Sequence, residues 1–345
     1  MPKNTDKRSL PRQHKRSHYH NYRKRSIYML TLCTEGRLPI LGTLCGDSTE
    51  TATVRPTALG EEVLRCWNNI PTIQKHLAQK KTEQTGLPCN RVISLLDCQL
   101  MPDHFHGIIF IHEDMDIAIG DVVRGFMAGC TKAYHATMQP LPDNKIKRPL
   151  WEKGYHDRIL CHAGQLDNMI AYLRDNPRRL WLKKMFPNNF AVLRNVQYGS
   201  YCFSSVGNIW LLDCPMHAIH VRSRFSDEES RQYMNDCIRA ARGGEVLVGA
   251  FISPKEKLVL DVALKEKLAV ICLVPYSFSE FYKPSGAYSD ACAQGLILFL
   301  SEASDENQNK RISRQECNHL NTIAENLAEI SAATTNYTSS VPPKP

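Results

Sequence analysis

Two histidines on one predicted strand are the residues of this chain best suited to hold a metal ion. Residues 101–109 read MPDHFHGII, so His104 and His106 are two positions apart. On a β-strand such residues face the same side, and Phe105 between them points to the opposite side, toward a core. Two imidazoles on one face can bind one metal ion. A His-x-His segment alone more often places one histidine at a solvent edge and the other at a turn.

A tyrosine and an asparagine lie one helical turn apart further along the chain. Residues 165–176 have the pattern of a helix, which we expect Pro177 to end. Tyr172 and Asn176 are four positions apart, so their Cβ atoms would lie about 5–6 Å apart on one face. The helix would then present a phenol and an amide oxygen together. Taken alone, the same spacing is typical of a packed tyrosine followed by an ordinary helix stop.

In combination, the strand with MPDHFHG and the helix with YLRDNP resemble the single-tyrosine HUH transposases, most closely the REP-associated tyrosine transposases. The resemblance covers residues 23–185 and includes WEKGYHD at 151–157. It implies that His104, His106 and Asn176 bind a divalent metal, Mg²⁺ or Mn²⁺, and that Tyr172 is the nucleophile. Many members of the family have asparagine before the first motif histidine, where this chain has Asp103, and this difference concerns the geometry of the turn.

The implied chemistry is cleavage and rejoining of single-stranded DNA through a covalent 5′-phosphotyrosine. A divalent ion would polarise the phosphodiester, and a phenol fixed in line with phosphorus would attack it. Because a phosphotyrosine keeps the energy of the broken bond, a second 3′-hydroxyl can reverse the step without ATP. We therefore expect a DNA transposase. A nicking and religating endonuclease of relaxase or replication-initiator type, and a non-catalytic single-stranded nucleic-acid-binding protein, are the alternatives.

The positive charge of the chain is concentrated in its first half. Residues 1–190 hold 28 Lys and Arg against 18 Asp and Glu, whereas residues 191–345 hold 15 against 17. In residues 1–22 the cations are interleaved with histidines and tyrosines, a pattern that favours a nucleic-acid-binding arm over a merely solvated tail. The resemblance to the REP-associated transposases further implies that the partner is single-stranded DNA with hairpin-forming repeat ends. The candidate DNA contacts are Arg23, Lys24, Arg25, Lys132, Arg174, Arg178, Arg179 and Lys183.

Four further residues near the two motifs have candidate roles. Trp151, Tyr155 and His156 could stack on unpaired bases, although Trp151 is equally suited to a core. Asp157 could accept a hydrogen bond from a metal-binding imidazole. The cations that follow Tyr172 on its helix could instead complement the negative end of the helix dipole.

The order of elements in residues 23–190 is strand, helix, strand, strand, helix, strand, helix. Strands are expected at 27–32, 90–100, 104–112 and 155–161, and helices at 57–70, 117–138 and 165–176. This order predicts an α+β domain with an antiparallel sheet and helices on one face. The resemblance further implies a ferredoxin-like (RRM-like) sheet whose central strand bears the two histidines.

The second half of the chain has a different pattern. Strands expected at 209–214, 218–221, 245–252, 270–274 and 296–300 alternate with helices near 226–242 and 254–268. This alternation indicates a parallel sheet, so we expect residues 201–330 to form a Rossmann-like α/β accessory domain. A helix beginning near Ser253 could bind a phosphate, but neither GxGxxG nor GxxxxGK[ST] is present. Residues 331–345 are expected to be a disordered tail.

Composition narrows the remaining possibilities. The 345 residues include 13 cysteines with no CxxC pair, which favours reduced, buried thiols over disulfides or structural zinc. No apolar stretch approaches the roughly 18 residues that cross a bilayer, and no signal peptide is evident. We therefore expect a cytoplasmic protein without a membrane partner. A homodimer is compatible with the sequence, which does not show the oligomeric state.

Overall fold

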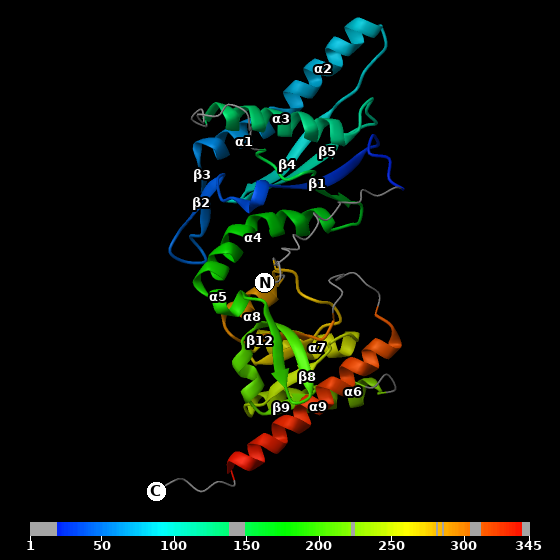
Figure 1. The fold of residues 1–345 in the computed structure, drawn as a ribbon. Coiled ribbons are helices and arrows are strands. Elements are labelled where there is room, and N and C mark those ends of the chain that lie inside the picture. Colours follow the sequence, from blue (N-terminus) through cyan, green and yellow to red (C-terminus); the bar gives the residue numbers. More distant parts are fainter. Residues whose placement is uncertain are drawn as a thin grey trace, which may run out of the picture. The chain divides into compact units, whose positions relative to one another are not determined.

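The computed structural model describes residues 19–137, 149–221, 225–280, 282–284, 286–303 and 312–339. The fold divides into a first unit, Met1–Trp181, and a second unit, Leu182–Pro345 (Figure 1). The sequence predicts a boundary between residues 190 and 201, whereas this division falls inside the helix that bears Tyr172. Most of the basic arm, residues 1–18, lies outside the described residues.

The first unit is built on a four-stranded antiparallel sheet. Its strands are β1 (Ser26–Cys33), β4 (Ile93–Leu100), β5 (His104–Ile111) and β6 (His156–Leu160), in the spatial order β4-β5-β1-β6. The helices α1 (Ala58–Asn68) and α2 (Ile70–Thr85) connect β1 to β4, and α3 (Ile119–Thr137) connects β5 to β6. A hairpin of β2 (Gly42–Cys45) and β3 (Thr53–Pro56) and a short turn of helix, η1 (Glu35–Arg37), precede α1. The unit is α+β, as the sequence predicts.

Helices cover both faces of this sheet, so the expectation of helices on one face is wrong. On one face Trp67 of α1 packs against Phe105 and Phe126, with ring centroids 5.0 and 5.6 Å away. On the other face Leu173 of α4 (Gln165–Met185) packs with Met29 and other strand residues (Figure 1). The central strands β1 and β5 carry apolar residues at both alternating sets of positions, and strands of this kind need cover on both sides.

The helix α4 continues beyond the proline that was expected to end it. Pro177 lies inside the helix, where it cannot donate a backbone hydrogen bond to the carbonyl of Leu173. Leu173 before the proline and Leu182 after it are both buried. The free energy gained by burying these two leucine side chains outweighs the loss of one backbone hydrogen bond at Pro177. By contrast, the helix expected at 57–70 does end before Pro71, since α1 ends at Asn68 and Pro71 lies in the first turn of the next helix, α2.

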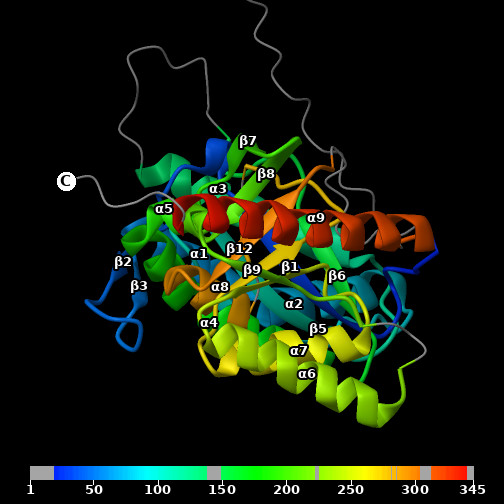
Figure 2. The same ribbon diagram turned by 90° about the horizontal axis from the view of Figure 1, so that it is seen from below.

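The second unit contains a six-stranded sheet in the order β7-β8-β12-β11-β10-β9. The strands β9 (Met216–Ala218), β10 (Val246–Gly249), β11 (Val270–Leu273) and β12 (Ile297–Ser301) are parallel, and β7 (Leu193–Tyr198) and β8 (Tyr201–Gly207) form an antiparallel hairpin at one edge. The α-helices of this unit are α5 (Pro187–Phe190), α6 (Asp227–Arg242), α7 (Pro254–Lys265), α8 (Ala287–Ala293) and α9 (Arg314–Ser339). Figure 2 shows α9 running across the unit. The predicted parallel sheet is confirmed, and its antiparallel edge is an addition.

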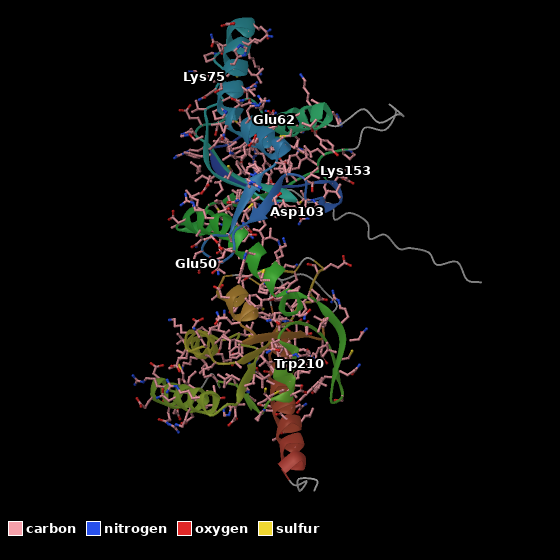
Figure 3. The ribbon with its side chains drawn as sticks, turned by 90° about the vertical axis from the view of Figure 1, so that its left-hand side faces the viewer. Glu50, Glu62, Lys75, Asp103, Lys153 and Trp210 are labelled. Atoms are coloured by element: carbon pink, nitrogen blue, oxygen red, sulfur yellow. The ribbon has the colours of Figure 1, made fainter. Side chains whose placement is uncertain are left out.

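Two predictions for the second unit are wrong. Residues 209–214 do not form a strand, because the Asn208 side chain accepts a hydrogen bond from the backbone N–H of Trp210 and begins the short helix η2 (Ile209–Asp213). The exposed Trp210 lies on this helix (Figure 3). The tail expected to be disordered is helical as far as Ser339. The buried Ser331 donates a hydrogen bond to the carbonyl of Cys214, which holds this part of α9 in place.

Among the described residues, no helix is both long enough and apolar enough to cross a membrane.

Candidate functional site

The two histidines of β5 lie together on the face of the sheet that α4 covers. Their ring centroids are 4.7 Å apart, and both side chains are buried. Phe105 between them lies on the opposite face and is completely buried. The alternation predicted for His104, Phe105 and His106 is therefore confirmed. The core on the far side anchors the strand and so fixes the direction of both imidazoles.

Each histidine has a partner at its Nδ1 atom. The Thr31 hydroxyl oxygen on β1 lies 2.8 Å from His106 Nδ1. The carboxylate of Asp103, which Figure 3 labels in the turn before β5, lies 2.6 Å from His104 Nδ1. Arg37 forms an ion pair with the same carboxylate at 3.3 Å. Partners at Nδ1 orient the ring and leave Nε2 as the nitrogen for a metal, an arrangement common in protein metal sites.

The sequence indicates neither of these partners. Asp103 differs from the asparagine common in the resembled family, and Thr31 is a polar residue in the mostly apolar segment 27–32. Asp157 was expected to hold an imidazole, and this is wrong. It pairs with Leu30 on β1, so its side chain projects from the face that α1 and α3 cover.

The α4 helix brings Tyr172 to the histidine pair. The Tyr172 ring centroid lies 5.9 Å from that of His106, although the two residues are 66 positions apart in the sequence. The neighbouring Leu173 is completely buried and fixes the helix against the sheet. Asn176 is buried one turn later, and its amide Nδ2 donates a hydrogen bond to the Tyr172 carbonyl at 3.0 Å. The amide oxygen is then the atom of Asn176 with the chemistry of a metal ligand.

Arg179 borders the tyrosine as well. Its guanidinium carbon lies 5.4 Å from the centre of the Tyr172 ring, over the ring face, and the side chain is buried. The Asp175 carboxylate lies 4.0 Å from Arg179 Nε and forms a closer ion pair, 2.6 Å, with Arg178. Of the predicted cations on this helix, Arg179 therefore borders Tyr172, whereas Arg178 contacts Asp175. Arg174 is mostly exposed and pairs with Asp97 of β4 at 3.0 Å.

The remaining predicted cations lie away from this site. Arg23, Lys24 and Arg25 precede β1, at the opposite end of the strand from the residue paired with His104. There Lys24 forms an ion pair with Asp114. Lys132 is exposed on α3, which covers the other face of the sheet. Lys183 follows Trp181 and belongs to the second unit.

Two of the residues expected to stack on bases belong to the core instead. Trp151 and Tyr155 are buried among the residues beneath α1 and α3, so the stacking expectation is wrong for Tyr155, and Trp151 takes the core position that the sequence offered as its alternative. His156, at the start of β6, is exposed. At the end of the arm Tyr22 stacks on Tyr28 with 5.9 Å between ring centroids, and the Nε2 atom of His20 lies 2.7 Å from the Tyr28 hydroxyl. These two arm residues therefore pack against the sheet.

The donor atoms fit a divalent metal that keeps open positions. Within the part of the chain that the structure describes, no cluster of three or more histidine, cysteine or acidic side chains is arranged to hold a metal. A metal at His104 and His106 would therefore complete its shell with the Asn176 oxygen, water or substrate oxygens. Mg²⁺ and Mn²⁺ accept such mixed shells, and the open positions suit a phosphate.

The helix terminus considered for phosphate binding is already occupied by the protein's own carboxylate. The side chain of Glu256 is buried at the start of α7, where its two oxygens accept hydrogen bonds from the backbone N–H groups of Val221, Ile252 and Ser253 at 3.0–3.2 Å. This carboxylate fills the position that a phosphate would take. The sequence, which lacks both phosphate-binding fingerprints, does not favour a phosphate site there, and the position of Glu256 argues against one as well.

No family model matches the chain, and no curated protein matches it. Among solved structures, a REP-associated tyrosine transposase bound to a REP hairpin is similar over 47% of this chain and 73% of its own, at 14% identity and a TM-score of 0.27. The single-stranded-DNA-binding DNA processing protein A of Helicobacter pylori is similar over 41% and 67%, at 22% identity and a TM-score of 0.30. A candidate transposase of Deinococcus radiodurans covers 47% of this chain and 97% of its own, at 16% identity and a TM-score of 0.22. Likenesses this weak carry no argument about this chain.

Proposed function

We propose that this protein is a DNA transposase that cleaves and rejoins single-stranded DNA through a covalent 5′-phosphotyrosine on Tyr172. One observation carries the proposal: a phenol, two imidazoles with fixed Nδ1 atoms and an arginine converge at one place on the sheet, from strands and a helix far apart in the sequence. We assign the first unit to the ferredoxin-like class, because its strand and helix order is the one that the sequence predicts. The second unit would be a Rossmann-like accessory domain.

In the proposed reaction His104 and His106 hold the divalent ion through their Nε2 atoms, with the Asn176 oxygen as a further ligand. A bound Mg²⁺ or Mn²⁺ would polarise the scissile phosphodiester and offset the negative charge that grows on it. Arg179 acts on the nucleophile, because a buried guanidinium over the Tyr172 ring stabilises negative charge on the phenol oxygen.

The Tyr172 oxygen then forms a bond to phosphorus, while the bond from phosphorus to the 3′-oxygen breaks. Two protons move in this step: the tyrosine hydroxyl gives its proton to solvent water, and the leaving 3′-oxygen takes one up. The product is a 5′-phosphotyrosine and a free 3′-hydroxyl. Attack of another 3′-hydroxyl on the phosphotyrosine reverses the step and joins two strands. The tyrosine is thereby restored, so the overall result is strand transfer without hydrolysis.

The proposal is tested by covalent attachment to DNA. Purified full-length protein is incubated with 5′- or 3′-labelled single strands that carry hairpins and with Mn²⁺, and is then denatured. We expect label from the strand 3′ of the cut to remain on the wild-type protein, since that strand carries the 5′-phosphate. Tyr172→Phe should bind the same DNA and give no attachment. EDTA should also prevent attachment.

Lys75→Ala is the matched control, because Lys75 is an exposed cation on α2 and is not among the candidate DNA contacts. It should form the adduct at the wild-type rate. Attachment that persists in Tyr172→Phe would remove Tyr172 from the nucleophile role. Tight DNA binding by wild type without any adduct, with either metal, would favour the non-catalytic single-stranded DNA-binding protein instead.

A further inference from the structure

A third histidine lies in the same row of the sheet as His106. In the register of the strands, Thr31 on β1 is paired with His106 on one side and with His156 on the other. Residues directly opposite each other in antiparallel strands project from the same face. The row therefore presents His106, Thr31 and His156 side by side on the face that carries α4.

Two neighbouring positions on β6 confirm which face His156 occupies. Leu160 belongs to the cluster that packs with Leu173 of α4, and the Arg158 guanidinium approaches the sulfur of Met169 on α4 at 3.8 Å. Residues 156, 158 and 160 alternate with the two residues between them, so their side chains share one face. His156 is exposed, unlike the two histidines of β5. It is thus on the site's face and open to a substrate.

An in-line displacement needs one group beside the attacking oxygen and another beside the leaving oxygen, and Tyr172 and His156 lie beside different strands of the same face. Tyr172 borders His106 on β5, whereas His156 stands on β6, with the strand β1 between them. Adjacent strands are about 4.8 Å apart, so the backbones of β5 and β6 are about 10 Å apart. A phosphodiester above Thr31 would have the phenol on one side and the His156 imidazole on the other. The leaving oxygen departs on the side opposite the attacking oxygen.

We infer that His156 is a further catalytic residue, the general acid that donates a proton to the 3′-oxygen as it leaves phosphorus. This inference rests on the proposed function. In the step, the Tyr172 oxygen bonds to phosphorus, the bond to the 3′-oxygen breaks, and the imidazolium proton passes to that oxygen. Histidine is the side chain most often used for such transfers, and His104 and His106 are the proposed metal ligands. In the reverse, joining step His156 would accept the proton of the incoming 3′-hydroxyl.

The test compares His156→Gln with wild type on two substrates that differ in one atom. One is ordinary single-stranded DNA, and the other has sulfur in place of the leaving 3′-oxygen at the scissile position. A thiolate leaves without a proton, so it needs no general acid. On the oxygen substrate we expect His156→Gln to slow adduct formation about 10²- to 10⁴-fold. On the sulfur substrate its rate should be within a few fold of wild type. DNA binding should be unchanged on both.

His162→Gln is the matched control, because His162 is an exposed histidine just beyond β6 and outside its paired residues. It should behave as wild type on both substrates. Equal slowing of His156→Gln on oxygen and sulfur, or weaker DNA binding that accounts for the slowing, would overturn the inference and leave His156 a binding residue. The inference would also be overturned if His156→Gln formed the adduct with the oxygen substrate at the wild-type rate. If wild-type protein forms no adduct with either substrate, the proposed function itself fails, and this inference fails with it.

Discussion

The Thr31 hydroxyl and the His106 imidazole join the two central strands of the first unit, with 2.8 Å between Oγ1 and Nδ1. Both side chains are at least partly buried, so water does not replace either partner readily. The bond fixes the ring orientation that directs His106 Nε2 toward the site. Losing a partner of this kind typically costs 10- to 100-fold in metal affinity. We therefore expect Thr31→Val to weaken Mn²⁺ binding by about that factor, as measured by titration calorimetry.

Thr31→Ser provides the control for this change, because it removes a methyl group and keeps the hydroxyl. It should bind Mn²⁺ nearly as well as wild type. Equal losses in Thr31→Val and Thr31→Ser would mean that packing, and not the hydrogen bond to His106, determines the affinity.

Asp103 makes the corresponding contact to His104, at 2.6 Å from Nδ1. Asp103→Ala removes the acceptor, and we expect it to weaken Mn²⁺ binding about 10- to 100-fold. Asp103→Asn keeps an oxygen that can accept the same hydrogen bond, so its loss should be clearly smaller. Mn²⁺ affinity of the two variants, measured side by side, checks the order. An Asp103→Asn variant as weak as Asp103→Ala would show that the negative charge matters more than the hydrogen bond.

Sequence patterns predict the site's local geometry better than its assembly. The alternation around Phe105 predicts the facing histidines, because it depends only on the period of a strand. The family resemblance, and not the local sequence pattern, predicts that Tyr172 belongs to the site, because spacing alone does not bring positions 106 and 172 together. The contacts of Thr31 and Asp103 depend on strand register and turn geometry, which no local pattern shows. Similarly, the course of α4 past Pro177 depends on burial at both ends of the helix.

Gly107 allows the histidine strand to pack against Trp67. A Cβ atom built at Gly107 would lie 2.4 Å from the Trp67 ring, on the face opposite the histidines. Gly107→Ala should therefore force the ring or the strand to move, at a cost of about 1–3 kcal/mol in the free energy of unfolding. We expect a lower thermal unfolding temperature for the full chain and a slower rate of adduct formation.

Gly125→Ala is a suitable control for Gly107→Ala, because a Cβ atom there meets nothing within 4 Å. Gly125 lies within α3, where alanine is the better helix former, so this variant should be as stable as wild type or more so. Adding Trp67→Phe to Gly107→Ala should destabilise the protein by less than the sum of the two single changes. If the losses in the free energy of unfolding of the two single variants simply add up in the double variant, contact with the Trp67 ring is not the reason why Gly107→Ala is destabilising.

The ion pair of Arg91 and Asp116 gives the first unit a stability that depends on pH. Arg91 Nε and Nη2 lie 2.7 and 2.8 Å from the two carboxylate oxygens of Asp116, and Lys81 lies 2.9 Å from one of them. The hydrogen bonds from Arg91, and less strongly that from Lys81, hold the pKa of Asp116 well below its ordinary value, against the opposing effect of burial. Because the folded state favours the carboxylate, the stabilisation is complete above the unfolded pKa, near 3.9, and is lost as the pH falls below it.

We therefore expect Asp116→Asn to lower the free energy of unfolding by about 1.5–3 kcal/mol at pH 7. The difference from wild type should shrink steadily between pH 4 and pH 2, because Asp116 becomes protonated in the unfolded chain there while it stays ionised in the folded protein, which lowers the free energy of unfolding of the wild type. Urea unfolding of both proteins across this range measures the difference. Glu62→Gln, which breaks the exposed ion pair of Glu62 with Arg65, should change little at any pH. A difference between wild type and Asp116→Asn that stays constant down to pH 2 would mean that packing of the side chain, and not its charge, supplies the stability.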